Sequence, residues 1–362
     1  MQKTIQGIEK IEGLLKTIGC RNIFMVIDSS YQFLNIKDRI ERIALKKTRF
    51  SDFTPNPLYE DVCKGIDLFN KEKCDAILAV GGGSSIDVAK CIKLAVLAKE
   101  GRDSLIPPLV SKHLDIDGGT LPFIAIPTTA GTGSESTHNA VMYYQGAKQT
   151  VTNDGVLPDF AILEPSVLKT LPLYQKKCTM MDALCQGIES WWSVNSTDES
   201  RNYSKIAVEM IVKYWRSYIF DNDDYAAYQI MKAANYSGKA INISATTAAH
   251  AMSYKITSLY HLPHGHAVAV CLPEIWNYML GISPKLPVFF DISKAMGFDN
   301  PFNAVTAIRN MMIQLNLKNP VAENRKKELD VLSKSVNPVR LKNNPIVIDE
   351  DVAWKLYDKI VL

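Results

Sequence analysis

The stretch DAILAVGGGSSIDVAK (75–90) indicates the class of fold. After Asp75 comes a short apolar run, then three glycines, then SSIDVAK with helical spacing. An apolar run that ends in glycines is typical of a strand buried on both faces of a parallel sheet. Glycine lets backbone approach a ligand closely, and free N–H groups at a helix start attract an anion. The stretch therefore predicts a strand, an anion-binding loop and a helix.

The same alternation extends through the first half of the chain. Apolar runs that end in turn residues occupy 22–28 and 122–128, and helical patterns occupy 59–74 and 84–101. Such alternation is typical of an α/β fold with its ligand site at the carboxyl ends of the strands. We therefore expect an α/β dinucleotide-binding domain over residues 1–169.

From about Leu171 onward the strand signals give way to long helical patterns. These cover 174–194, 200–219, 225–243 and 303–315. The proline-containing segment 156–172 is expected to be the hinge before an all-helical domain, residues 170–362, with a cleft between the two domains. The remainder after Leu286 predicts only helices that close the second domain.

The composition excludes several classes of protein. A formal net charge of +3 with dispersed basic residues argues against a nucleic-acid partner. The seven cysteines form no C-x-x-C pair, which is typical of reduced thiols in a cytosolic protein. No apolar run reaches the roughly 20 residues of a membrane span. We expect a cytoplasmic protein with no membrane association.

A second loop, PTTAGTGSEST (127–137), follows the next predicted strand. Two such loops after consecutive strands favour one extended ligand across the sheet edge, and a dinucleotide has that length. The spacing is not G-x-G-x-x-G, so the ordinary Rossmann fingerprint is not matched. The residues predicted to bind the cofactor here are Gly82, Gly83, Ser84, Asp87 in the first helical turn, Thr128, Thr129, Thr132 and Ser134.

Ser84, and a further predicted cofactor residue, Asp28, each have a structural alternative. Ser84 is equally compatible with a plain tight turn that ends in an N-cap serine. Asp28, at the end of the run 22–28, is placed to accept hydrogen bonds from a ribose hydroxyl and to repel a 2′-phosphate, which favours NAD over NADP. It is also an ordinary strand-ending turn residue.

The helical stretch MDALCQGIES (181–190) carries a polar row on an apolar background. Asp182, Gln186 and Glu189 project from one face of a helix, so they need a polar partner. Four of the six histidines lie between His250 and His266. This concentration, with the polar row upstream, predicts a divalent metal site.

Taken together, GGGSSIDVAK, PTTAGTGSE, the D-A-x-x-x-x-x-E row, HAMSY and PHG resemble the iron-containing (group III) alcohol dehydrogenase family. That family is similar in fold to glycerol dehydrogenase and dehydroquinate synthase. The resemblance implies a metal, Fe²⁺ or Zn²⁺, held by Asp182, Gln186, His250 and a loop residue, His264. The family usually has histidine where this chain has Gln186, and an amide oxygen is a weaker ligand for these metals than imidazole.

The resemblance also implies roles for Tyr254, Lys148 and Leu163, whereas the role of His266 is inferred from its place two residues after His264. Tyr254 replaces a histidine near the nicotinamide, and its phenol titrates near pH ~10. His266 is an additional imidazole that could relay protons, or a solvent-facing loop residue. Lys148 would contact the cofactor and Leu163 would cover the adenosine, the alternatives being an exposed lysine and a core leucine.

The resemblance is nearest to the phosphonoacetaldehyde reductase branch, which forms 2-hydroxyethylphosphonate. A dianionic substrate favours a cationic pocket, and Lys239 is the predicted cation, although it also suits an exposed helix position. The alternatives are a generic short-chain alcohol or diol dehydrogenase, a dehydroquinate-synthase-like lyase that uses NAD, and a relative without metal. The expected partners are a small aldehyde or alcohol and other copies of the chain, as a homodimer.

Overall fold

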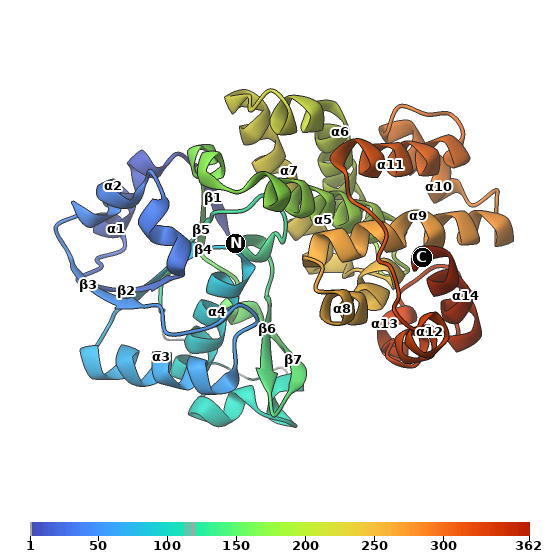
Figure 1. The fold of residues 1–362 in the computed structure, drawn as a ribbon. Helices are drawn as coiled ribbons and strands as arrows, with labels where there is room; N and C mark the ends of the chain where they lie inside the picture. Colours follow the sequence, from blue (N-terminus) through green and yellow to red (C-terminus); the bar gives the residue numbers. More distant parts are fainter. Residues whose placement is uncertain (1, 113, 115, 117–119) are drawn as a thin grey trace. The chain divides into compact units, whose positions relative to one another are not determined.

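The computed structural model describes residues 2–112, 114, 116 and 120–362. The chain forms two compact units, Met1–Leu171 and Pro172–Leu362. The first is an α/β unit and the second is helical (Figure 1), so the predicted fold class is confirmed. In the described ranges, no helix combines the length and the apolar character that a membrane span requires.

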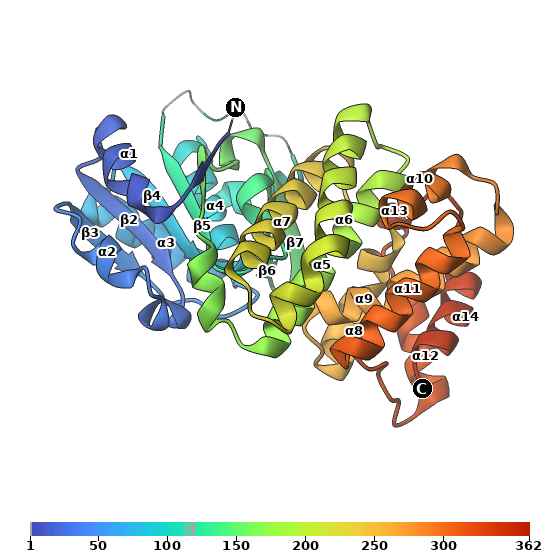
Figure 2. The same ribbon diagram turned by 90° about the horizontal axis from the view of Figure 1, so that it is seen from above.

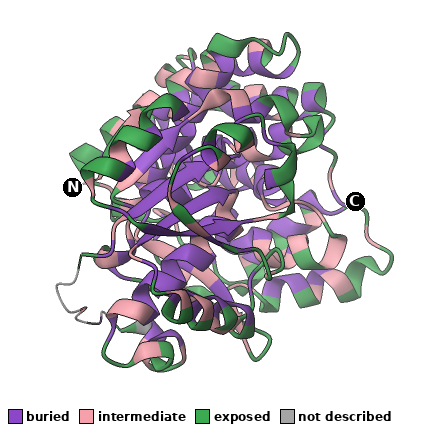
Figure 3. Cartoon of the chain, turned by 90° about the vertical axis from the view of Figure 1, so that its left-hand side faces the viewer, coloured by how far each residue is buried: buried purple, intermediate pink, exposed green. Residues whose placement is uncertain are grey.

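The first unit is built on a six-stranded sheet in which all neighbouring strands are parallel. In spatial order its strands are β1 (Lys3–Gln6), β8 (Phe160–Leu163), β5 (Phe123–Pro127), β4 (Ala76–Gly81), β2 (Asn22–Ile27) and β3 (Lys46–Phe50). The three strands predicted from apolar runs, β2, β4 and β5, are neighbours inside the sheet. Every residue of these three is buried, as expected of strands covered on both faces (Figure 3).

Helices cover both faces of this sheet (Figure 1). They are α1 (Ile11–Thr17) and α2 (Lys37–Glu41) on one face, and α3 (Tyr59–Glu72) and α4 (Gly83–Leu97) on the other. Alternate residues of β2, Phe24 and Val26, join the core beneath α3 and α4. There the Phe24 ring meets the edge of the Phe69 ring at 5.4 Å between centroids.

The order of the strands creates a switch point between β2 and β4. After β2 the chain moves outward to β3 and then returns to the other side of β2 as β4. The loops that follow β2 and β4 therefore lead to opposite sides of the sheet. In open α/β sheets the ligand crevice lies at such a point, outside the carboxyl ends of the strands.

The segment 156–172 was expected to be a hinge, and most of it belongs to the first unit. Strand β8 lies between β1 and β5, with Ala161 opposite Thr4 and Ala125. Pro158 and Pro165 flank this strand and remove no ladder hydrogen bond from it. The sequence pattern also missed the antiparallel hairpin of β6 (Asn139–Tyr144) and β7 (Ala147–Thr152).

The second unit is all-helical within the described residues. Its helices are α5 (Leu173–Trp192), α6 (Asp198–Ile219), α7 (Asp224–Ser244), α8 (Ala248–Tyr260), α9 (His264–Ile282), α10 (Pro287–Ala295), α11 (Pro301–Leu315), α12 (Arg325–Lys334), α13 (Pro338–Leu341) and α14 (Glu350–Ile360). The central helix is α5, which packs against α6, α7, α8, α9 and α10 (Figure 2). Its residues from Met180 to Trp192 are all buried, so polar side chains there must find partners inside the unit.

Candidate functional site

Three helices of the second unit bring together an aspartate and two histidines. Asp182 lies in α5, His250 in α8 and His264 at the start of α9. One ligand atom from each lies within 4.8 Å of the other two. His250 Nε2 is 3.3 Å and His264 Nε2 is 3.9 Å from the same oxygen, Asp182 Oδ1. A carboxylate oxygen and two imidazole nitrogens that converge in this way suit a divalent transition metal. We call this group the Asp–His–His cluster.

The cluster has a buried wall and an open side. Asp182 and His250 are buried, whereas the His264 side chain is 38% exposed. Burial works to lower the pKa of His250, but the carboxylates of Glu189 and Asp182 outweigh it and raise that pKa to about 9. Burial also opposes ionisation of Asp182, yet its histidine neighbours hold its pKa below the usual value. Two buried carboxylates around one imidazole create a negative environment that a cation would balance.

Glu189 is the partner that fixes His250. Its Oε1 accepts hydrogen bonds from the Thr247 backbone N–H at 3.2 Å, the Thr247 hydroxyl at 2.8 Å and the Ala249 N–H at 2.8 Å. Its Oε2 hydrogen-bonds to His250 Nδ1. One fully buried carboxylate therefore satisfies the first N–H groups of α8 and turns His250 Nε2 toward Asp182. Carboxylates orient metal-binding histidines in this way.

The proline-histidine-glycine sequence places His264 on a helix, where a loop was expected. Helix α9 begins at His264 directly after Pro263, its N-cap. The next residue, Gly265, lies so close to α5 that a Cβ atom there would overlap the Cys178 carbonyl oxygen and lie 2.9 Å from Asp182 Cβ. Glycine is required because the two backbones touch at this point. This contact brings His264 within reach of Asp182.

Gln186 lies one helical turn after Asp182 and is buried. Its side chain hydrogen-bonds to the Asp182 carboxylate. Its Oε1 atom is also buried, and none of the described residues donates a hydrogen bond to that atom. An amide oxygen is a neutral ligand that divalent cations accept. The donor set of the cluster, with this amide beside it, fits a divalent metal.

Tyr254 packs directly on the cluster. Its ring is parallel to the His264 ring, with 5.7 Å between the centroids and an angle of 5° between the planes. Arg340 Nη1 donates a hydrogen bond of 3.0 Å to the Tyr254 hydroxyl. The guanidinium carbon lies 5.3 Å from the centre of the same ring. Tyr254 thus links the cluster to a cation.

Two other predicted residues lie outside the cluster. His266 is buried in α9, so the expectation of a solvent-facing loop residue is wrong. Its Nε2 donates to the Lys318 carbonyl oxygen at 2.8 Å, and its Nδ1 accepts from the Tyr174 hydroxyl at 2.8 Å. Burial lowers the pKa of His266. Because both ring nitrogens are engaged, the geometry favours a structural role over proton relay.

The predicted substrate cation, Lys239, is half-buried in the C-terminal half of α7. Its Nζ lies 5.4 Å from the centre of the Tyr236 ring, three residues earlier on the same helix. This contact lies within the helix of Lys239 itself. Arg340 is a cation that contacts Tyr254, the neighbour of the cluster.

The part of the chain after Leu286, expected to do no more than close the domain, supplies Arg340 and Asn343 near the start of α8 and the cluster. Besides Arg340, Asn343 accepts a hydrogen bond of 2.8 Å from the Ser193 hydroxyl. Its Nδ2 donates to the carbonyl oxygens of Ser244 and Thr246 at 2.8 and 2.9 Å, which fixes the segment that leads into α8. No local pattern marks either residue, because their partners are distant in the sequence.

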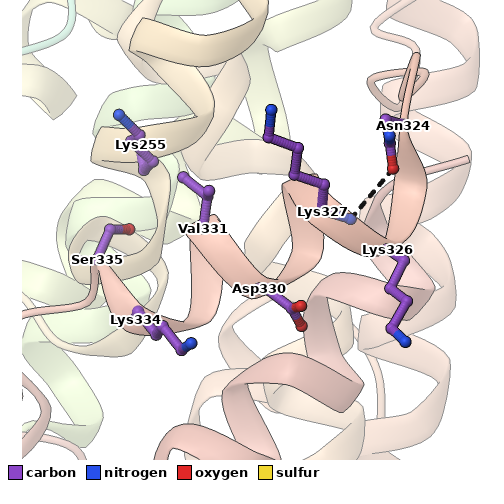
Figure 4. Close-up of a pocket in the computed structure, with 8 residues that line it drawn as sticks. All are labelled: Lys255, Asn324, Lys326, Lys327, Asp330, Val331, Lys334 and Ser335. Atoms are coloured by element: carbon purple, nitrogen blue, oxygen red, sulfur yellow. Dashed lines mark hydrogen bonds between the residues drawn. The ribbon is translucent and has the colours of Figure 1, made fainter.

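A surface depression of about 660 Å³ lies between α8 and α12 of this unit (Figure 4). Its lining includes the lysines Lys255, Lys326, Lys327 and Lys334. None of the residues predicted for the metal or the substrate lines this depression. It is a basic surface beside α8, separate from the cluster.

In the first unit the two predicted nucleotide-binding loops lie against each other. The Thr128 N–H donates to the Gly81 carbonyl oxygen at 2.9 Å. A Cβ atom on Gly83 would lie 3.1 Å from Thr132 Cγ2, and one on Gly82 would lie 3.6 Å from Thr129 Cγ2. The loops after β4 and β5 therefore form one continuous surface at the carboxyl ends of these strands.

The start of α4 provides backbone N–H groups for an anion. Its N-cap is Gly82, and no side chain caps it. Ser84 is the second residue of the helix, and its hydroxyl accepts from the Asn56 N–H at 3.4 Å. The alternative of a turn that ends in an N-cap serine is therefore wrong. Uncapped amides at the start of a 15-residue helix suit a phosphate group.

Asp87 and Ser134, two of the residues predicted to bind the cofactor, hydrogen-bond to each other and hold the second loop in place. Asp87 lies in the second turn of α4, not the first, and accepts from the Ser134 hydroxyl at 2.7 Å and the Val141 N–H at 3.1 Å. A residue that the sequence did not single out, Lys90, is fully buried and donates to Ser134, Thr137 and the Asn139 carbonyl oxygen. Burial lowers the pKa of Lys90 to about 8.

The other residues that the sequence predicted to bind the cofactor lie at the same edge of the sheet or near it. Asp28 follows β2, and its carboxylate accepts from the Ser85 hydroxyl at 3.0 Å and the Ser30 N–H at 2.8 Å. Leu163 ends β8 and is buried, as a core leucine would be. Lys148 lies in β7, close enough to Asp87 to lower the pKa of that carboxylate, although burial raises it overall.

Two family models match the chain. "Iron-containing alcohol dehydrogenase" matches residues 3–165, and "Fe-containing alcohol dehydrogenase family, C-terminal" matches residues 177–361. The NAD-dependent methanol dehydrogenase of Bacillus methanolicus is 29% identical over 80% of this chain and 76% of its own. The 1-propanol dehydrogenase PduQ of Salmonella typhimurium is 27% identical over 84% and 80%.

Solved structures show the same fold. Sulfoacetaldehyde reductase from Bifidobacterium kashiwanohense, in complex with NAD⁺, superimposes with a TM-score of 0.90 at 24% identity, over 99% of this chain and 96% of that one. A 1,3-propanediol oxidoreductase superimposes with a TM-score of 0.89 at 23% identity, over 99% and 97%.

Proposed function

The chain belongs to the iron-containing alcohol dehydrogenase family and is an oxidoreductase that acts on CH–OH groups, and from this premise we propose that it is a metal-dependent, NADH-linked reductase of phosphonoacetaldehyde. The product would be 2-hydroxyethylphosphonate. The observation that carries the chemistry is the convergence of Asp182, His250 and His264 within 4.8 Å.

These three residues would hold Fe²⁺ or Zn²⁺, with Gln186 as a neutral fourth donor. When bound, the metal supplies Lewis-acid polarisation of the aldehyde oxygen and the reduced nicotinamide supplies the hydride. Glu189 keeps His250 in the tautomer whose Nε2 faces Asp182. The half-exposed His264 leaves one side of the cluster open, which is what a site that admits a substrate requires.

We propose Tyr254 as the proton donor to the product oxygen. Its hydroxyl accepts a hydrogen bond from Arg340 and has its own O–H to donate. Its ring lies flat on His264, so the hydroxyl belongs to the surroundings of the cluster. His266 is the second choice, because Tyr174 and the Lys318 carbonyl already occupy its two nitrogens.

For the cofactor we propose NAD(H) in preference to NADP(H). The uncapped start of α4 would bind the pyrophosphate, next to the loop that contains Thr129 and Thr132. Asp28 lies at the end of β2, where a carboxylate favours a free ribose hydroxyl and repels a 2′-phosphate. Lys148 and Leu163 would complete the cofactor contacts.

A second candidate is a short-chain alcohol dehydrogenase with no preference for an anionic substrate. Two relatives named for methanol and for 1-propanol favour it. The resemblance of MDALCQGIESWWSVNSTDES and LPHGHAVAV to the phosphonoacetaldehyde reductase branch favours the first proposal.

The decisive experiment is NADH oxidation by protein reconstituted with Fe²⁺, with Zn²⁺ or with no metal. Each form is offered phosphonoacetaldehyde and, as an uncharged control, propanal. We expect metal-dependent oxidation with kcat/KM at least tenfold higher for phosphonoacetaldehyde, roughly the effect of one charge-assisted hydrogen bond. Equal rates would favour the second candidate. No oxidation with any metal would overturn the reductase proposal and favour an NAD-using lyase or a metal-free relative.

A further inference from the structure

A row of three side chains leads away from the open side of the cluster. His264 begins α9, Tyr254 lies in α8 and Arg340 lies in α13. The Tyr254 ring is parallel to the His264 ring at 5.7 Å and has the Arg340 guanidinium 5.3 Å from its centre. The Arg340 hydrogen bond to the Tyr254 hydroxyl fixes the guanidinium at this position. A cation is thus held one aromatic ring away from a residue of the cluster.

This position suits recognition of the substrate better than stabilisation of the fold. Helix α13 is short and has no buried residue, and Arg340 itself is half-buried. The bond that joins Arg340 to Tyr254 is between two partly buried side chains 86 residues apart. An arginine on so small an element contributes little core packing, but its planar group can present paired N–H donors to an oxyanion.

We propose that Arg340 is the residue that recognises the anionic group of the substrate, with Tyr254 as its positioning partner; this rests on the function proposed above. The carbonyl oxygen of the substrate lies at the Asp–His–His cluster, and a phosphonate or another tetrahedral oxyanion two carbons away lies against Arg340. The two ends of such a molecule are roughly 5 Å apart, from bonds of about 1.5 Å. The row from the His264 ring to the Arg340 guanidinium has two steps, of 5.7 and 5.3 Å. A metal–oxygen distance of about 2 Å at one end and a hydrogen bond of about 2.9 Å at the other extend the reach of the molecule to about 10 Å, which is comparable with these two steps together.

The surroundings of α8 support an anionic ligand. Lysines 255, 326, 327 and 334 line the depression between α8 and α12 (Figure 4). Since Lys255 follows Tyr254 directly, its side chain points about 100° away around the helix, so these lysines are not part of the row. Their charge raises the local concentration of an anion and so predicts a salt-dependent kcat/KM for a charged aldehyde only.

The test compares Arg340→Gln and Arg340→Lys with the matched control Lys342→Gln. Lys342 is an exposed cation two residues away. We expect Arg340→Gln to lower kcat/KM for phosphonoacetaldehyde about 100-fold, mainly through KM. For propanal we expect a smaller loss, less than about tenfold and through kcat, because the Tyr254 hydroxyl loses only the hydrogen bond from Arg340. Arg340→Lys should recover part of the loss, and Lys342→Gln should match the wild type. Equal losses on both aldehydes, or no loss, would overturn the inference.

A binding measurement tests the anion site at Arg340 independently of whether the proposed function is correct. Calorimetry of ethylphosphonate with metal-loaded protein needs no turnover. We expect binding to the wild type and to Lys342→Gln, and at least tenfold weaker binding to Arg340→Gln. If the wild type reduces only propanal yet binds ethylphosphonate through Arg340, the substrate is wrong and the anion site stands. If ethylphosphonate binds all three proteins equally or none of them, the inference fails even where aldehyde reduction succeeds.

Discussion

Replacing Glu189 with glutamine should weaken metal binding while leaving the metal-free protein, above about pH 9, almost as stable as the wild type. In the wild type, Oε1 of Glu189 accepts three hydrogen bonds of 2.8 to 3.2 Å from Thr247 and Ala249. The introduced amide oxygen can keep these bonds. The amide NH₂ then takes the place of Oε2 and faces His250 Nδ1, where the wild type has a carboxylate.

The size of the effect follows from the two tautomers of His250. Without metal and above about pH 9, where His250 is neutral, Nδ1 can accept from the new amide while Nε2–H donates to Asp182, 3.3 Å away, so every group keeps a partner. With metal on Nε2, Nδ1 must carry the hydrogen, and two donors face each other. The metal-bound form loses one charge-assisted hydrogen bond, about 1.5–3 kcal/mol, or roughly 10- to 100-fold in metal affinity. At that pH the free energy of unfolding of the metal-free protein should fall by less than about 1 kcal/mol. At lower pH the loss should be larger, because the substitution removes the carboxylate that stabilises protonated His250.

The assay is competition for Zn²⁺ against a chelator of known affinity, together with urea unfolding of the metal-free protein. Tryptophan fluorescence reports on this region because Trp192 Nε1 donates to the Thr247 hydroxyl at 2.8 Å. The matched control is Glu274→Gln, which alters a carboxylate of α9 paired with Arg309 at 2.8 Å. A metal affinity within twofold of the wild type would refute the reasoning. So would equal losses of stability with and without metal, because Glu189 would then act only as a helix cap.

Three further substitutions test other parts of the structure. Gly265→Ala should push α9 away from the Cys178 carbonyl, cost about 1–3 kcal/mol of unfolding free energy and weaken metal binding at least tenfold. The control Gly281→Ala, in the same helix with open space around its Cβ position, should not destabilise the protein. Equal losses in the two variants would contradict the close-contact argument. Lys90→Met should cost about 1–3 kcal/mol near pH 7, because it removes the donor to three acceptors. Because the pKa of Lys90 is about 8 in the folded protein and 10.5 in the unfolded chain, the folded protein releases this proton first as the pH rises. The free energy of unfolding of the wild type should therefore rise by about 1–2 kcal/mol relative to the variant between pH 8 and 9.5. Hydrogen exchange of β4 that shows no such rise would refute this reasoning. Asp28→Gly should shift the ratio of kcat/KM for NADH over NADPH at least tenfold toward NADPH, and an unchanged ratio would exclude Asp28 from the choice of cofactor.

Much of the fold could be predicted because its signals are local. A strand buried on both faces must be apolar throughout, so β2, β4 and β5 were visible as runs of residues. Strands β1 and β8 were missed because they are only four residues long and owe their place to pairing with each other. Edge and inserted strands of this kind are specified by partners distant in the sequence.

The sequence by itself determined the chemistry that is available: a glycine loop between strand and helix, a polar row at helical spacing and a concentration of histidines. Helical geometry alone placed Asp182, Gln186 and Glu189 on one face. Only the tertiary structure decided how these groups are used. It turned Glu189 toward His250, engaged both nitrogens of His266, and brought Arg340 from the far end of the chain to Tyr254. The reason is physical: periodicity fixes which face a side chain occupies, but its partner is set by helix packing between segments that are far apart in the sequence.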